Sequence, residues 1–110
     1  MYAIEEGLKK INGETVETFS REVVETNTGL LVEAGTTGYK GGCCRDAGGR
    51  TFISIVCECG DFHFGKVTDE NGKFIGVEIA CCGDAGLNAI MKALEFAHEA
   101  INDQRRNVDD

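Results

Sequence analysis

The stretch TFISIVCECGDFHFGKVTDENGKFIGVEIAC, residues 51–81, decides the fold because apolar and polar side chains alternate along most of it. Residues 51–59 are rich in β-branched side chains and predict one strand. Residues 61–67 and 73–81 alternate in the same way, and Asn71-Gly72 between them is a strong hairpin signal. We therefore expect three antiparallel strands. The buried face of the last strand is expected to carry Ile75, Val77, Ile79 and Cys81.

Beyond these strands, apolar residues recur at intervals of three and four, which predicts a long helix over residues 86–103. Asp84 precedes it and is the expected N-cap. Such a helix buries its apolar stripe by covering one face of the sheet. The stripe is expected to contain Leu87, Ile90, Met91, Leu94, Ala97, His98 and Ile101.

The N-terminal part of the chain is harder to interpret. Residues 2–11 carry apolar side chains at helical spacing before Asn12-Gly13, so they predict a short amphipathic helix. Residues 14–25 fit a helix or a strand. We favour a strand for the second half, because Asn27-Thr28-Gly29 resembles a hairpin loop in which Gly29 supplies the positive φ.

Together these elements predict an α+β fold, with antiparallel β-meander and hairpins, a short N-terminal helix and a long C-terminal helix packed on the sheet. The chain of 110 residues is expected to form one domain, with a frayed tail at 107–110. A chain this short has a modest core, so sharing apolar faces between copies in a homo-oligomer is expected.

The net charge of −8 argues against binding to nucleic acid polymers and to anionic membranes, because both need extended basic surfaces. A small anionic ligand remains compatible with this charge. The N-terminus lacks the basic start and apolar run of a signal peptide, and no segment approaches twenty apolar residues. The expected location is the cytoplasm.

Residues 35–50, GTTGYKGGCCRDAGGR, contain six glycines and carry a local charge of +2 from Lys40, Arg45 and Arg50 against Asp46. Backbone N–H groups and cations of such a loop can cradle a phosphate. The loop matches neither a Walker A sequence nor a G-x-G-x-x-G fingerprint, and a flexible surface loop without a ligand explains the same composition. The candidate binding residues in it are Thr36, Thr37, Gly38, Tyr39, Gly41, Gly42, Arg45 and Arg50.

Six cysteines occur as Cys43-Cys44, Cys57-x-Cys59 and Cys81-Cys82. Their spacing differs from the C-x-x-C pairs of common zinc sites, so we interpret them as free thiols and keep a cysteine-based metal or redox protein as the alternative function. The sequence places no histidine beside a cysteine and shows no clustered carboxylates. We expect no catalytic residues, no metal and no cofactor.

Three segments resemble a family of small phage proteins, the Thoeris anti-defence sponges of the first type: VEAGTTGYKGG, GGRTF and VEIACCGDAGLNAIMKALEFA. The likeness covers roughly residues 30–103. It implies a protein that is not an enzyme and that sequesters cyclic ADP-ribose isomers, and in some members cyclic oligonucleotides, in the bacterial host cytoplasm. Sequestration of these messengers blocks anti-phage signalling.

The resemblance also implies a ligand pocket between protomers of a homo-oligomer. Within it, Arg50 would hold a phosphate, Phe74 would stack on adenine, and Asn88 and Arg105 would complete the pocket. The chain departs from the family pattern at Cys43-Cys44 and at Cys81-Cys82. The first departure lies within the proposed binding loop.

Overall fold

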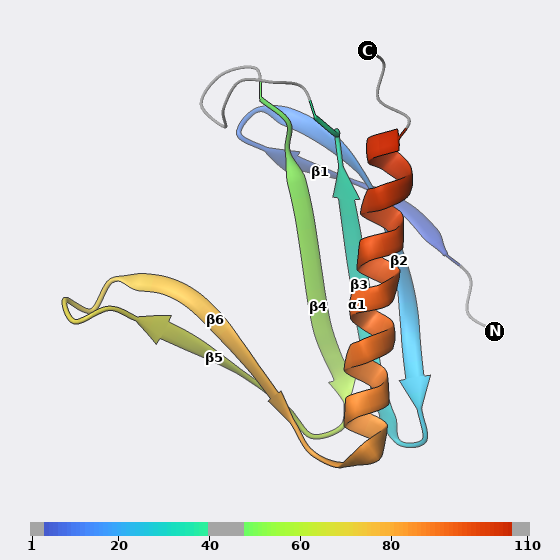
Figure 1. The fold of residues 1–110 in the computed structure, drawn as a ribbon, viewed down its shortest axis with the longest axis vertical. Helices are drawn as coiled ribbons and strands as arrows, with labels where there is room; N and C mark the ends of the chain where they lie inside the picture. Colours follow the sequence, from blue (N-terminus) through green and yellow to red (C-terminus); the bar gives the residue numbers. More distant parts are fainter. Residues whose placement is uncertain (1–3, 40–47, 107–110) are drawn as a thin grey trace.

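The computed structural model describes residues 4–39 and 48–106, and it has the α+β architecture that the sequence predicts. Six antiparallel strands form two separate sheets, and one long C-terminal helix packs on the larger sheet (Figure 1). The elements are β1 (Glu5–Ile11), β2 (Glu14–Glu25), β3 (Thr28–Thr36), β4 (Thr51–Cys59), β5 (Phe62–Thr68), β6 (Phe74–Cys81) and α1 (Gly83–Arg106).

The larger sheet has the strand order β1-β2-β3-β4, so each strand pairs with its neighbour in sequence. Helix α1 lies along β2 and β3 on one face of this sheet. Small alanines on the helix let it approach the branched side chains of the strands closely. The buried cluster between them consists of Val23, Leu30, Val32, Ala34, Ala89, Ala93, Phe96 and Ala97.

The short N-terminal helix predicted for residues 2–11 is wrong. Glu5–Ile11 is strand β1, which pairs with β2 from Glu5 opposite Ser20 to Ile11 opposite Glu14. Asn12 and Gly13 connect the strands with φ values of 48° and 85°, as a two-residue hairpin requires. The dipeptide that we interpreted as a helix stop is therefore a hairpin turn, and strand pairing outweighs the helical spacing of the apolar residues.

Residues 14–25 are strand throughout, which extends the prediction made for their second half. The hairpin that follows turns at Thr26-Asn27, and Thr26 has the positive φ, 49°, that we expected at Gly29. Gly29 is instead part of β3, where it pairs with Val24 and Cys59. The hairpin was thus predicted correctly, and its turn lies further towards the N-terminus.

The β1–β2 hairpin curls over the face of the sheet opposite α1. Lys9 of β1 places its amino group 5.3 Å from the ring centre of Phe52 on β4, although two strands separate β1 and β4 in the sheet. A close backbone contact accompanies this curvature: a Cβ atom on Gly35 would lie 2.1 Å from the carbonyl oxygen of Glu17. Only glycine at position 35 fits this contact.

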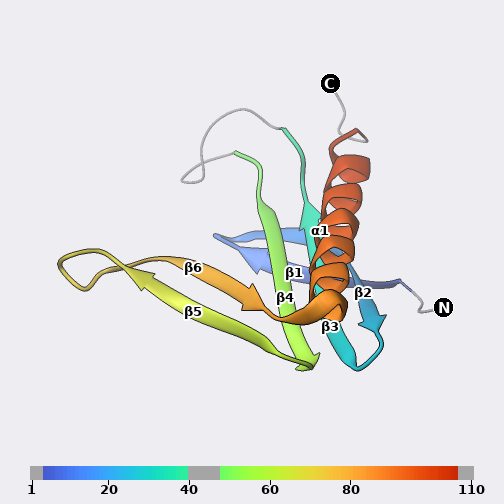
Figure 2. The ribbon, with the colours of Figure 1, turned by 60° about the horizontal axis from the view of Figure 1, so that its bottom comes forward.

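Strands β5 and β6 form a two-stranded hairpin, here called the arm, which extends away from the larger sheet and from α1 (Figures 1 and 2). Asp69 stabilises the turn of the arm, because its side-chain oxygen accepts hydrogen bonds from the N–H groups of Asn71 and Lys73 at 2.9 Å. The prediction of a buried face on β6 is wrong: Ile75, Val77 and Ile79 are exposed, and Cys81 is only half-buried.

Helix α1 begins at Gly83 and is longer than the predicted range of 86–103. Asp84 therefore lies in the first turn, where its charge favours the helix dipole, and not at the N-cap. The predicted stripe divides into a buried part and an exposed part, the latter including Leu87, Met91 and Leu94. Among the described residues, no helix is long and apolar enough to cross a membrane.

Candidate functional site

The two ends of the glycine-rich loop are joined by hydrogen bonds where β3 ends and β4 begins. The N–H of Thr37 donates to the carbonyl oxygen of Arg50 at 2.9 Å, and the N–H of Arg50 donates to the Thr37 hydroxyl at 2.9 Å. The Thr36 hydroxyl donates to the same Arg50 carbonyl at 3.1 Å and accepts from the N–H of Gly38 at 3.0 Å. We call residues 36–38 together with 48–50 the clasp.

Gly49 makes this close pairing possible, because a Cβ atom at that position would lie 2.2 Å from the carbonyl oxygen of Gly38. Gly49 thus has a steric role at the clasp. The predicted site residues Thr36, Thr37, Gly38 and Arg50 lie here together. Gly41, Gly42 and Arg45 of the same prediction lie outside the described residues.

Arg50, the last residue of the clasp, is only 4% exposed. Its Nε donates to the carbonyl oxygen of Ile11 at 3.1 Å, and its Nη1 donates to the carbonyl oxygen of Gly48. These bonds join the end of β1 to the end of the loop. The guanidinium therefore connects the clasp to the β1–β2 hairpin and adds a positive charge to it.

The C-terminal end of α1 reaches the clasp through Gln104. Its side-chain oxygen accepts a hydrogen bond from the N–H of Thr36 at 3.0 Å, and its side-chain nitrogen donates to the carbonyl oxygen of Glu17 at 2.8 Å. One side chain thus connects α1 to both β2 and β3. The sequence analysis missed Gln104, because a glutamine on the polar side of a helix has no distinguishing signal.

Beside the clasp, Tyr39 and Arg105 form a pair. The Tyr39 ring is 76% exposed, and the guanidinium carbon of Arg105 lies 5.9 Å from its centre, within cation–π range. Arg105 Nε also donates to the side-chain oxygen of Asn102 at 2.8 Å, which steadies the guanidinium. An exposed ring and an exposed cation therefore meet at the end of the molecule where the clasp lies.

The structure does not bring Phe74 and Asn88 to this cluster. Phe74 begins β6 near the turn of the arm, where the Lys66 amino group lies 6.0 Å from its ring centre. Asn88 is exposed near the start of α1, about 25 Å from Arg105 along the helix at 1.5 Å per residue. Within one chain, the predicted site residues that the structure describes thus occupy three separate places.

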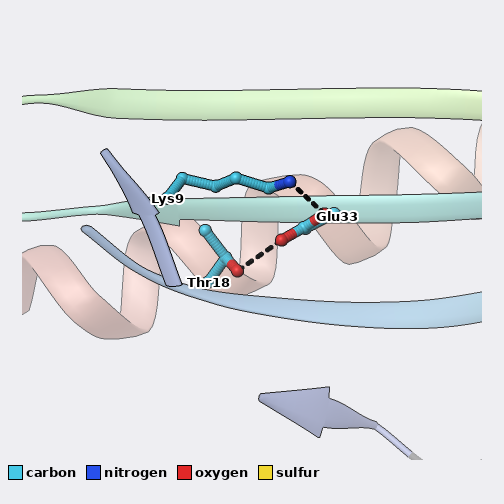
Figure 3. Close-up of polar contacts among 3 residues, drawn as sticks. All are labelled: Lys9, Thr18 and Glu33. Carbon is cyan, nitrogen blue, oxygen red and sulfur yellow. Dashed lines mark hydrogen bonds and ion pairs between the residues drawn. The ribbon is translucent and has the colours of Figure 1, made fainter. Parts of the chain in front are cut away.

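A polar cluster that the sequence analysis missed lies on the sheet face opposite α1 (Figure 3). The Thr18 hydroxyl donates to one carboxylate oxygen of Glu33 at 2.5 Å, and the Lys9 amino group lies 3.8 Å from the other. These residues come from β2, β3 and β1 respectively, so the cluster joins the curled hairpin to the sheet. Since Thr18 is buried and its hydroxyl is satisfied, we assign this cluster a structural role.

Further along this face, Glu58 forms a carboxyl pair with Glu22. A hydrogen bond to Glu22 is the main cause that raises the pKa of Glu58 above its ordinary value of 4.5, with smaller contributions from desolvation and from the charge of Glu22. Within the described residues, no group of three or more His, Cys, Asp or Glu side chains could hold a metal ion. Cys57, Cys59, Cys81 and Cys82 are free thiols.

A groove of about 370 Å³ lies between β2 and α1, away from the clasp. Its lining contains three carboxylates and two cations, and none of the predicted site residues, so its charge is unfavourable for a phosphate. The lining residues are Arg21, Glu22, Val23, Val24, Lys92, Glu95, Phe96 and Glu99.

Comparison of the chain with protein-family models, with curated proteins and with solved structures found no match. The candidate site is therefore supported by its geometry alone.

Proposed function

We propose that the protein binds and sequesters a small cyclic nucleotide without altering it chemically. A cyclic ADP-ribose isomer is the first candidate and a cyclic oligonucleotide the second, and sequestration of either would block bacterial anti-phage signalling. The observation that carries the proposal is the meeting of Tyr39 and Arg105 beside the clasp. An exposed ring stacks on a base, and an exposed guanidinium binds a phosphate through paired hydrogen bonds.

In this proposal the clasp determines the shape of the binding site, and Arg105 provides a positive charge that a ligand can reach. Arg50 adds a positive charge to the clasp, and its guanidinium donates to the carbonyl oxygens of Ile11 and Gly48. Arg50 is only 4% exposed, so its guanidinium would have to become accessible before it could contact a phosphate directly, as the family resemblance implies. Arg105 is therefore the sharper residue for testing phosphate binding, since it is exposed before ligand arrives.

Phe74 and Asn88 would join the site from a second copy of the chain. Within one chain Phe74 lies on the arm and Asn88 lies near the opposite end of α1 from Arg105. A pocket shared between protomers would let Phe74 or Asn88 of a second copy contact the ligand that Tyr39 and Arg105 hold. The proposal thus includes a homo-oligomer.

The test is a calorimetric titration with cyclic ADP-ribose isomers and cyclic dinucleotides, followed by heat denaturation and chromatography of the released ligand. We expect saturable binding of at least one cyclic nucleotide and its recovery intact. Arg105→Ala should weaken binding roughly tenfold to a hundredfold, as expected for a lost charge-assisted contact. Arg21→Ala is the matched control, because it removes an equal charge at an exposed position of the distant groove.

Two outcomes would overturn the proposal. One is the absence of binding across all these ligands, and the other is recovery of a converted product, which would make the protein an enzyme. An equal loss of affinity in Arg21→Ala and Arg105→Ala would remove the clasp as the binding site.

A further inference from the structure

The C-terminal end of β2 has a neighbouring strand on one side only. β1 pairs with β2 as far as Ser20, which lies opposite Glu5. Before Glu5 the chain leaves the sheet, since Ile4 is outside β1 and 56% exposed. Within the part of the chain that the structure describes, residues 21–25 therefore pair with β3 and with no strand on their other side (Figure 1). We call this open side of residues 21–25 the β2 edge.

The β2 edge presents backbone N–H and C=O groups that can receive another strand. The β2–β3 hairpin has a two-residue turn, so the flanking residues Glu25 and Thr28 bond to each other. In an antiparallel pair every second residue bonds to the same neighbour, so Val23 also bonds to β3. The N–H and C=O groups of Glu22 and Val24 then point to the β2 edge. An extended peptide beside β2 could bond to them and add a fifth strand to the sheet.

The groove between β2 and α1 runs along this edge. The consecutive residues 21–24 all line it, although successive side chains of a strand point to opposite faces of the sheet. A hollow that both faces of β2 reach lies along the side of the strand, and β3 on the other side contributes no lining residue. Its second wall is α1. Val23 and Phe96, which are 5% and 8% exposed, add buried apolar surface to it.

The charge of the groove favours a cationic side chain. Lys92 forms an ion pair with Glu25, which leaves Arg21 as the other cation of the lining. Glu22 belongs to the sheet face opposite α1, where it pairs with Glu58, and the other carboxylates belong to the helix. Lysine or arginine side chains on either face of an added strand would thus meet a carboxylate, and their aliphatic stems would cover apolar surface. The lining carboxylates are those of Glu22, Glu95 and Glu99.

We propose that the β2 edge binds an extended, lysine- or arginine-rich segment of a partner protein as an added strand. The open backbone groups recognise an extended backbone, and the carboxylates on both faces select basic side chains. A second copy of the chain would bring the same carboxylates to the edge, and like charges on facing strands disfavour such pairing. None of the clasp residues lines the groove, so this site is separate from the proposed nucleotide site.

The test is a titration of the full chain with a capped peptide of alternating lysine and valine, followed by NMR. In the free protein, the amide hydrogens of Glu22 and Val24 should exchange faster than that of Val23, which bonds to β3. Binding should be saturable and should slow exchange at Glu22 and Val24 about tenfold when the peptide is present at roughly ten times its Kd. A glutamate–valine peptide of equal length is the charge control and should not bind.

Val24→Pro tests the added strand from the side of the protein. Proline removes an N–H that faces the β2 edge and leaves the bonds to β3 in place, so this variant should keep the wild-type circular dichroism and lose peptide binding. A protein with unchanged peptide affinity in Val24→Pro would contradict the proposal.

A second variant keeps the proposal testable if proline disturbs β2. Glu95→Gln combined with Glu99→Gln removes two exposed carboxylates from the groove and should weaken peptide binding about threefold to tenfold. Glu70→Gln combined with Glu78→Gln is the matched control, because both residues are exposed on the arm. An equal loss of affinity in the two double variants would remove the groove as the binding site.

Three further results would overturn the proposal. One is the absence of saturable binding of the lysine–valine peptide. Another is equal binding of the same peptide with every amide nitrogen methylated, which would reduce the groove to a site for cations alone. The third is slow exchange at Glu22 and Val24 that grows with protein concentration in the absence of peptide, which would make a second copy the occupant.

The proposed function is tested separately from this inference. Arg105→Ala should leave peptide binding unchanged, because Arg105 lies outside the groove. A protein that binds the peptide and no cyclic nucleotide would support the strand-binding site and contradict the proposed function. Binding of unaltered nucleotide without binding of the peptide would do the reverse.

Discussion

Arg50 is a charged residue that is buried, and its hydrogen-bond partners explain why this burial is tolerated. Its guanidinium donates to two backbone carbonyls, and its own backbone N–H and C=O bond to the two threonines of the clasp. A buried cation is tolerated when its donors are satisfied in this way. The residue thus connects the β1–β2 hairpin, the loop ends and β4.

Replacing Arg50 by alanine should destabilise the ligand-free protein. The carbonyl oxygens of Ile11 and Gly48 lose a charged donor, and such a loss costs about 1.5–3 kcal/mol. Arg105→Ala, at an exposed position, should change the free energy of unfolding by only about 0.5 kcal/mol. Urea denaturation of both variants measures the difference, and equal stabilities would show that Arg50 does not hold the clasp.

Gly35 provides a second test at the residue scale. Gly35→Ala would place Cβ against the backbone of Glu17 and Thr18, and such overpacking costs about 1–3 kcal/mol. Gly76→Ala is the matched control, because its Cβ would meet nothing closer than Val67 at 3.8 Å. Thermal unfolding should show a lower midpoint for the first variant alone; an unchanged midpoint would contradict the close contact between β2 and β3.

Part of the candidate site could be predicted from the sequence. The glycines, threonines and Arg50 of the loop were identifiable because they are adjacent in the chain and unusual in composition. Gln104 and the Lys9–Thr18–Glu33 cluster were not, since their roles arise from contacts between distant segments. Alternation along a strand cannot indicate which polar residue will face a partner two strands away.

At the scale of elements, the two Asn-Gly pairs explain one correctly predicted hairpin and one strand that was wrongly predicted as a helix. Both Asn12-Gly13 and Asn71-Gly72 lie in turns between antiparallel strands. The second was recognised because clear alternation flanks it, whereas apolar residues at helical spacing precede the first. The Asn-Gly turn was the stronger signal, because such a turn favours residues that adopt a positive φ, whereas the spacing of the apolar residues in 2–11 is compatible with a helix or a strand.

The attachment of α1 to the clasp can be tested by amide hydrogen exchange. Gln104→Ala removes the acceptor for the N–H of Thr36, so exchange at this amide should accelerate. The N–H of Thr37 bonds to Arg50 and should remain protected. Arg105→Ala, one residue along the helix, is the control and should change neither amide. Unchanged protection of Thr36 in Gln104→Ala would contradict the connection.

At the scale of the whole molecule, the position of the arm could not be predicted from the sequence. The pattern on β6 correctly indicated one apolar face, and we assigned that face to the core of the same sheet. The structure instead separates β5 and β6 into a second sheet and leaves the face uncovered. Periodicity shows that a face requires a partner, but it does not show whether the partner belongs to the same chain.

Native mass spectrometry of the wild-type protein with added cyclic ADP-ribose isomers tests sequestration in an oligomer, because one spectrum reports both the number of subunits and the bound ligand. We expect an assembly of two or more 11.8 kDa chains that retains nucleotide of unaltered mass. A spectrum containing only ligand-free protein, or only ligand of changed mass, would contradict it.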